Sequence, residues 1–173
     1  MAKTLIAFFS HAGQNYSHGS IRNLAVGNTE VVAKKIHAMI DSDLFFIDTV
    51  RKYPDDHMKK IEIAKREFNE NARPELTARV ADMDKYDTII IAFPNWWTTM
   101  PMAVFTFLES YDFSGKTLCP LITHGGSGFS NSLKDIQRLC PEAKLTKGLA
   151  VNGDDAACCD KELEKWLRQI GLI

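Results

Sequence analysis

The chain has 173 residues, of which 45% are hydrophobic and 25% are charged, values that fit one globular domain with a sizeable core. Its formal net charge of −1 excludes the strong basic field of a nucleic-acid-binding protein. No apolar stretch approaches the roughly 20 residues that span a membrane, and the first apolar run, 5–9, is too short for a signal peptide. The four cysteines show neither C-x-x-C nor zinc-ligand spacing, so we expect reduced thiols. We therefore expect a cytoplasmic protein without nucleic-acid or membrane partners.

Strand-like and helix-like segments alternate along the chain. Apolar runs predict five strands, at residues 3–9, 44–50, 88–93, 117–123 and 145–151. Helical periodicity predicts helices at residues 29–41, 54–71, 101–110, 130–140 and 161–170, the second with Ile61, Ala64 and Phe68 facing inward. This alternation predicts a three-layer α/β/α fold, with a five-stranded parallel sheet between two layers of helices. Right-handed crossovers favour the strand order 2-1-3-4-5, and no linker divides residues 1–173, so we expect a single domain.

Proline at position 120 conflicts with a regular fourth strand. Its nitrogen has no hydrogen to donate to a neighbouring strand, so proline is rare in the interior of a sheet. We expect either a bulge at Pro120 or a strand that is paired on only one side at that residue.

The first predicted strand ends at Ser10, and the first predicted helix begins near Gly27-Asn28-Thr29-Glu30. Asn28 or Thr29 can cap this helix, and the free N–H groups of a helix start can bind an anion. The hydroxyls of Ser10 and Thr29 add donors that suit a phosphate group. A helix cap alone would also explain these residues, but their place after the first strand favours a ligand site. The motifs G-x-x-x-x-G-K-[ST] and G-x-G-x-x-G are absent, which argues against a nucleotide triphosphatase and against a dinucleotide site.

Two tryptophans follow the third predicted strand, in the segment Pro94-Asn95-Trp96-Trp97-Thr98. An indole offers a broad apolar face and one N–H, which suits stacking on an aromatic ligand. The alternative is that both rings cover the edge of the sheet. We expect one ring to stack near the ligand and the other to pack against the protein.

A glycine-rich segment, Thr123-His124-Gly125-Gly126-Ser127-Gly128, follows the fourth predicted strand. Glycine permits positive φ and close approach of the backbone to a ligand, so this turn can present N–H and C=O groups to the edge of a flat ring. The alternative is a flexible turn between a strand and a helix. His124 is a candidate proton donor, a candidate hydrogen-bond partner or simply an exposed residue.

Together these loops resemble those of the flavodoxin-like FMN-binding proteins, whose Gly-Asn-Thr segment holds a phosphate and whose later loops hold the isoalloxazine ring. The chain is similar to a branch that carries Asn-Tyr-x-x-Gly and then Gly-Asn-Thr-Glu in an insert, here from about Gln14 to Val26. The resemblance implies a flavodoxin-like sheet, FMN as the cofactor, and neither a metal nor a catalytic side chain. It implies cofactor contacts from Ser10, Asn15, Tyr16, Asn28, Thr29, Pro94, Asn95, Trp96, Trp97, Thr98, Thr123, His124, Gly125, Gly126 and Gly128.

Two functions agree with this resemblance. In the first, the protein acts in electron transfer and docks on a redox partner protein; in the second, it is an FMN-dependent NAD(P)H oxidoreductase that reduces quinones or similar acceptors. Flavodoxin carriers tend to be strongly acidic and this chain is not, although Asp154, Asp155 and Asp160 are candidates for local acidity at the ligand edge. A third reading is an interaction module that has lost its cofactor, and the intact loops argue against it. The residues leave the oligomeric state open, a homodimer included.

Overall fold

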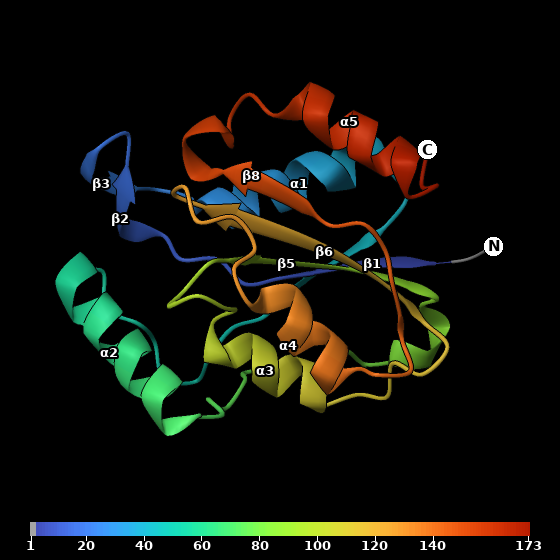
Figure 1. Ribbon diagram of the computed structural model, residues 1–173, viewed down its shortest axis with the longest axis horizontal. Coiled ribbons are helices and arrows are strands. Elements are labelled where there is room, and N and C mark those ends of the chain that lie inside the picture. Colours follow the sequence, from blue (N-terminus) through green and yellow to red (C-terminus); the bar gives the residue numbers. More distant parts are fainter. Residues whose placement is uncertain (1–2) are drawn as a thin grey trace.

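The computed structural model describes residues 3–173, and one parallel sheet forms its centre (Figure 1). The strands of this sheet are β1 (Thr4–Phe8), β4 (Asp43–Phe46), β5 (Thr88–Pro94), β6 (Thr117–His124), β7 (Lys144–Leu145) and β8 (Leu149–Asn152). They lie in the order β4-β1-β5-β6-β7, and β8 also pairs with β6. This order confirms the predicted 2-1-3-4-5 arrangement, with the last strand in two pieces.

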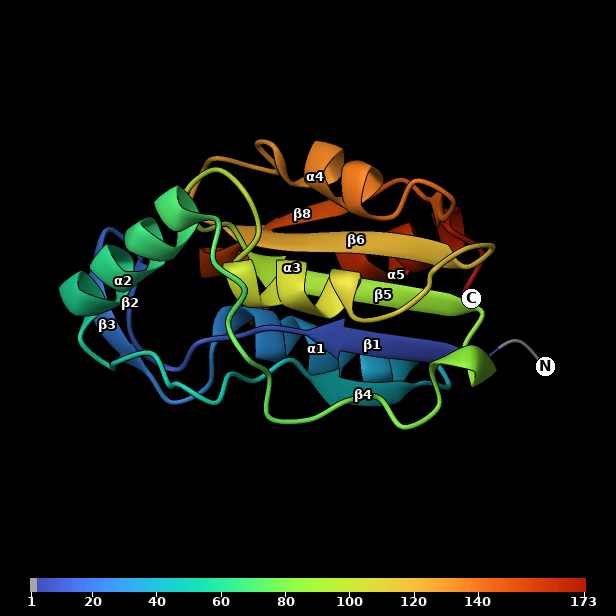
Figure 2. The ribbon, with the colours of Figure 1, turned by 90° about the horizontal axis from the view of Figure 1, so that it is seen from below.

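Helices cover both faces of the sheet, as the alternation predicts (Figures 1 and 2). One face carries α1 (Asn28–Met39) and α5 (Asp160–Gln169), and the other carries α3 (Met102–Glu109) and α4 (Ser132–Leu139). Successive strand residues point to opposite faces, so the core forms two clusters. Ile6 and Ile90 belong to the cluster under α1 and α5, whereas Leu5 and Ile91 belong to the cluster under α3 and α4. Among residues 3–173, no helix is both long enough and apolar enough to cross a membrane.

Helix α2 (His57–Glu70) departs from this layering, because it lies beyond the carboxyl ends of the strands (Figure 2). It begins at His57 rather than at residue 54, since the Asp56 carboxylate accepts a hydrogen bond from the Lys59 N–H (2.9 Å) and caps the helix there. Ala64 is buried, as predicted. Phe68 is 41% exposed, which corrects its predicted inward position. The reason is that α2 packs on β2 and α3 instead of covering the sheet.

The insert after the first strand folds as a β-hairpin of β2 (Gly13–Ser17) and β3 (Ser20–Leu24). Its two turn residues, His18 and Gly19, have φ angles of 50° and 79°. Positive φ at both central positions is the signature of a type I′ turn, which matches the twist of a two-residue hairpin. The hairpin stands beside α2 at the carboxyl edge of the sheet (Figure 1).

Pro120 lies at a position where β6 is paired on one side only, one of the two predicted solutions. Its neighbour on β5 is Ile91, and the register with β5 runs through it without a bulge. On the other side, β7 pairs with residues 117–118 and β8 with residues 121–124, so residues 119–120 have no strand partner there. The Pro120 carbonyl points to this gap, 3.0 Å from where a Cβ on Gly148 would lie. The edge of Pro120 that lacks an N–H therefore faces the break between β7 and β8, which divides the last predicted strand in two.

Candidate functional site

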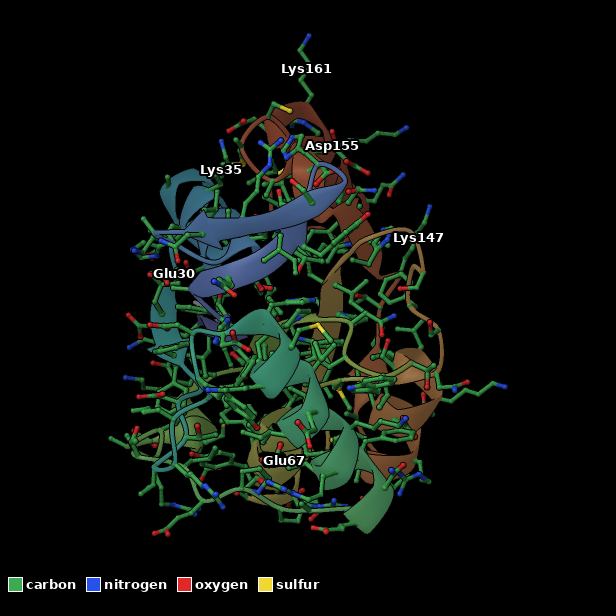
Figure 3. All side chains as sticks on the ribbon, turned by 90° about the vertical axis from the view of Figure 1, so that its left-hand side faces the viewer. Glu30, Lys35, Glu67, Lys147, Asp155 and Lys161 are labelled. Atoms are coloured by element: carbon green, nitrogen blue, oxygen red, sulfur yellow. The ribbon has the colours of Figure 1, made fainter. Side chains whose placement is uncertain are left out.

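A cavity of about 280 Å³ opens at the carboxyl edge of the sheet, between the strand ends, the hairpin and α2. Its volume is close to the lower end of the range for small-molecule sites. Figure 3 looks onto this end of the molecule, where the hairpin and α2 face the viewer. The predicted cofactor-binding residues that line the cavity are Ser10, Asn15, Tyr16, Asn28, Thr29, Pro94, Asn95, Trp96, Trp97, Thr123, His124 and Gly125. The three predicted loops thus meet at one cavity.

Three predicted contact residues, Thr98, Gly126 and Gly128, lie outside this lining. Their φ angles are 71°, 126° and 59°, so each makes a sharp bend in its loop. This geometry shapes the loops that carry other residues to the cavity, and the contact of these three residues with a cofactor stays a prediction.

The start of α1 is built differently from the prediction. The N-cap residue is Gly27, not Asn28 or Thr29, and no side chain of its own caps the helix. Instead the Ser10 hydroxyl, from the end of β1, accepts a hydrogen bond from the Glu30 N–H at 3.1 Å. A Cβ at position 27 would lie 2.2 Å from that hydroxyl oxygen and 2.7 Å from the His11 carbonyl oxygen, so only glycine fits. The strand end and the helix start are therefore locked together.

Two threonine hydroxyls meet beside this helix start. The Thr29 and Thr123 oxygens are 2.7 Å apart, and both residues are buried. A single hydrogen bond between two hydroxyls uses one hydrogen and leaves the other to donate. Ser10 likewise accepts from Glu30 and keeps its own hydrogen. With the unpaired N–H groups of the first helical turn, these donors form a site suited to an anion.

The tryptophan loop separates its two rings. Trp96 packs edge-on against Phe9 and Tyr53, with ring centroids 5.0 Å and 5.1 Å apart. Trp97 is 39% exposed, and its indole N–H donates to the Ile61 carbonyl of α2 at 3.1 Å. Trp96 is thus the ring that packs against the protein, and Trp97 lies at the mouth of the cavity with a bond to α2.

The glycine loop is held by side chains on both of its flanks. The Asn95 amide nitrogen lies within hydrogen-bond distance of Ser127 Oγ (2.9 Å), the Gly128 carbonyl (3.0 Å) and Ser130 Oγ (3.1 Å). His124 Nδ1 accepts a hydrogen bond from the Gly126 N–H at 2.8 Å. Among the roles open to His124, this contact makes it a hydrogen-bond partner within the turn. These contacts tie the glycine loop to the tryptophan loop and to the end of β6.

Sequence reasoning missed several residues that line the cavity: His11, His57, Lys60, Ile61, Ala64 and Gly153. Lys60 is only 3% exposed, and burial lowers its pKa to about 8. Burial and the nearby Lys60 charge lower the pKa of His11 to about 4, and the same two causes lower that of His57. One signal was available: Lys60 precedes Ala64 by one helical turn and so shares the face that the helical pattern assigns to the interior.

Asp154 is the carboxylate on the cavity wall and connects it to the tip of the hairpin. One of its oxygens accepts from the His18 backbone N–H at 2.8 Å and lies 3.6 Å from the His18 ring nitrogen. Of the three aspartates considered for local acidity, Asp155 and Asp160 do not line the cavity, and Asp160 pairs with Lys35 at 2.8 Å.

Residues 3–173 contain no group of three potential metal ligands.

Comparison with known proteins agrees with this architecture. A family profile described as Flavodoxin matches residues 3–170, whereas a search of the curated proteins finds no match. A candidate flavoprotein from Bacteroides eggerthii DSM 20697 has a TM-score of 0.80 and 26% identity over 100% of both chains. One from Bacteroides uniformis ATCC 8492 has a TM-score of 0.76 and 30% identity, over 96% of this chain and 98% of that chain.

A flavoprotein from Lactobacillus acidophilus NCFM, solved in complex with FMN, has a TM-score of 0.68 and 23% identity, over 96% of this chain and 99% of its own. The Flavodoxin match spans nearly all of the described residues, on a sheet of the order that the βα alternation predicts. This chain therefore belongs to the flavodoxin family.

Proposed function

We propose that this protein binds FMN in the cavity at the carboxyl edge of the sheet and acts in electron transfer. The observation that carries the proposal is the meeting of three loops at one cavity: the Ser10–Thr29 side, the Trp96-Trp97 loop and the Thr123–Gly125 turn. The Lactobacillus acidophilus relative, which was solved with FMN, supports the choice of ligand. We also infer that the hairpin insert assigns the chain to the branch with Asn-Tyr-x-x-Gly in this loop, and that the protein acts in the cytoplasm.

The residues present fit the two chemically different ends of FMN. The start of α1, with the hydroxyls of Ser10, Thr29 and Thr123, offers the donors that a phosphate accepts. Gly153 leaves room for the Asn28 side chain beside them, since a Cβ there would lie 2.6 Å from the Asn28 amide nitrogen. At the other end, Trp97 and the clamped glycine turn offer an aromatic face and backbone polar groups to a flat ring.

When bound, FMN supplies a ring that accepts and returns electrons, and the protein supplies binding and orientation. Two aromatic residues at the cavity, Tyr16 and Trp97, are 63% and 39% exposed. They offer a partner protein an apolar contact next to the ring site, which is what a carrier needs. A redox protein is accordingly the proposed partner.

The visible spectrum of the purified protein, with mass identification of the released ligand, tests whether the protein binds FMN. A yellow protein that releases FMN is expected. A colourless protein that takes up no FMN on incubation would contradict the proposal and favour an interaction module.

Anaerobic mixing of the FMN-loaded protein with NADH or NADPH tests whether the protein is an electron carrier. A carrier is expected to be reduced slowly or not at all by these donors alone. Rapid bleaching by NADH or NADPH, followed by turnover with benzoquinone, would replace the carrier with an NAD(P)H oxidoreductase.

A further inference from the structure

Lys60 is a buried cation in the wall of the cavity. It lies on α2, and its side chain reaches the base of the hairpin, where Nζ donates to the Gln14 carbonyl (2.9 Å) and to the Asn15 side-chain oxygen (2.9 Å). The residue is 3% exposed, while its neighbour Lys59 points to solvent. The fold therefore holds this one lysine of α2 against the cavity.

Both partners of the Lys60 ammonium are neutral oxygens. Among the ion pairs of residues 3–173, none includes Lys60. An ammonium group has three N–H donors, and the two oxygens occupy two of them. One donor and the full positive charge remain without a partner of opposite sign.

A buried charge without a counter-charge is costly, so proteins rarely retain one unless it is paired or binds a ligand. The cost appears in the lowered pKa of Lys60, which has burial as its cause. A lysine is not required to hold the hairpin, because a neutral donor can satisfy two oxygens without carrying charge into the interior. The positive charge itself is the feature that needs an explanation.

The other groups on this wall leave the Lys60 charge uncompensated. His11 and His57 cannot supply a negative charge, and the Asp154 carboxylate contacts the hairpin tip at Ser17 and His18 and forms no ion pair with Lys60. Asp55 and Asp56, which precede α2, are exposed. A negatively charged group inside the cavity would supply the missing partner.

We infer that Lys60 is the positive charge that the cavity offers to an anionic part of its ligand. This inference rests on the proposed function, because FMN carries negative charge in two places: always on its phosphate, and on its ring when the ring is reduced and deprotonated. The two sources share one chemistry, an anion next to a buried ammonium, and they are distinguished by experiment.

Two variants separate the charge from the hydrogen bonds. Lys60→Met removes both, whereas Lys60→Gln removes the charge and keeps an N–H donor for the hairpin oxygens. Lys59→Met is the matched control, since it removes one positive charge from the exposed adjacent position. For each protein, the affinities of the apo form for oxidised FMN and for riboflavin are measured, together with the midpoint potential of bound FMN.

If Lys60 faces the phosphate, both Lys60 variants should bind FMN roughly 10- to 100-fold more weakly, the range for a charged hydrogen bond, with riboflavin little changed. If it faces the reduced ring, the oxidised ligands should bind normally and the midpoint potential should fall. A tenfold loss of preference for reduced FMN corresponds to about 30 mV for a two-electron couple. Either pattern supports the inference, and Lys59→Met should show neither.

Wild-type behaviour of Lys60→Gln in all three measurements would overturn the inference, because the charge would then be dispensable. An equal loss of FMN and riboflavin in both Lys60 variants would also overturn it, by showing that Lys60 only supports the hairpin. Failure of the wild-type protein to bind FMN at all is a different result: it contradicts the proposed function, and the inference falls with it.

Discussion

The two sides of the cavity are built in different ways. On the α1 side, Ser10, Gly27, Thr29 and Thr123 come from strand ends and a helix start, and three of the four are buried hydroxyl residues. The Thr29 and Thr123 hydroxyls bond to each other, and the Ser10 hydroxyl accepts from the Glu30 N–H. On the α2 side, the hairpin meets a helix through Lys60, and the contact joins residues 45 and 46 positions apart in the chain. The α1 side is part of the sheet edge itself, whereas the α2 side is formed by a helix and a hairpin that lie outside the sheet.

From this contrast we infer that the cavity wall is rigid on the α1 side and adjustable on the α2 side. The α1 side cannot move without breaking the contact between β1 and α1, so we expect substitutions there to affect folding and ligand binding together. The α2 side lies outside the sheet and is attached by packing on β2 and α3 and by polar contacts such as those of Lys60. We therefore expect substitutions there to change ligand binding or the response to pH with smaller effects on folding.

The largest expected effect comes from Gly27→Ala on the α1 side. The added Cβ would collide with Ser10 Oγ and with the His11 carbonyl, so strand and helix must separate. We expect a loss of about 2 kcal/mol in the free energy of unfolding, measured by chemical denaturation. Gly125→Ala is the matched control for stability, because a Cβ there meets no atom within 4 Å. Equal stability of the two variants would show that the α1 side is not rigid.

The next largest effect is a loss of FMN affinity when the hydroxyls on the α1 side are removed. The double variant Ser10→Ala with Thr29→Ala removes two hydroxyls at the helix start, so FMN should bind roughly 10- to 100-fold more weakly in a fluorescence titration. Riboflavin, which lacks the phosphate, should lose much less. The same loss for both ligands would argue against a phosphate at this position.

The smallest expected effect is a change in pH dependence on the α2 side. The pKa of His11 is lowered from 6.5 to about 4 in the folded protein. As the pH falls, His11 is therefore protonated in the unfolded chain at a higher pH than in the folded protein. The contribution of neutral His11 is therefore complete above pH 6.5 and is lost as the pH falls from 6.5 towards 4. We expect His11→Gln to flatten the decline in unfolding free energy over that range.

Denaturation curves at several pH values check this expectation, with His37→Gln as the control, because His37 is exposed on the outer part of α1. If the wild-type protein and His11→Gln decline in parallel on acidification, His11 does not contribute to the acid sensitivity of this region.

Local patterns in the sequence were sufficient for the sheet, the four covering helices and the convergence of three loops. Apolar runs such as 88–93 bury both faces of a central strand, and the parallel direction of the strands then brings their carboxyl ends to one edge. The one-sided pairing at Pro120 is also a local feature, because proline has no N–H to donate to any neighbouring strand. These features depend on residues that are neighbours in sequence or on chain chirality, so they can be predicted without knowledge of the packed molecule.

The rest of the site depends on contacts between segments that lie far apart in the chain. The cap of α1 comes from Ser10 rather than from Asn28 or Thr29, because β1 ends against that helix. The position of α2 and the burial of Lys60 depend on contacts with a hairpin more than forty residues earlier in the chain. Helical periodicity gives the face on which a lysine lies, but whether that face meets water, sheet or cavity is a property of the packed molecule. The cavity wall that carries the unpaired positive charge is for this reason the part that the sequence did not predict.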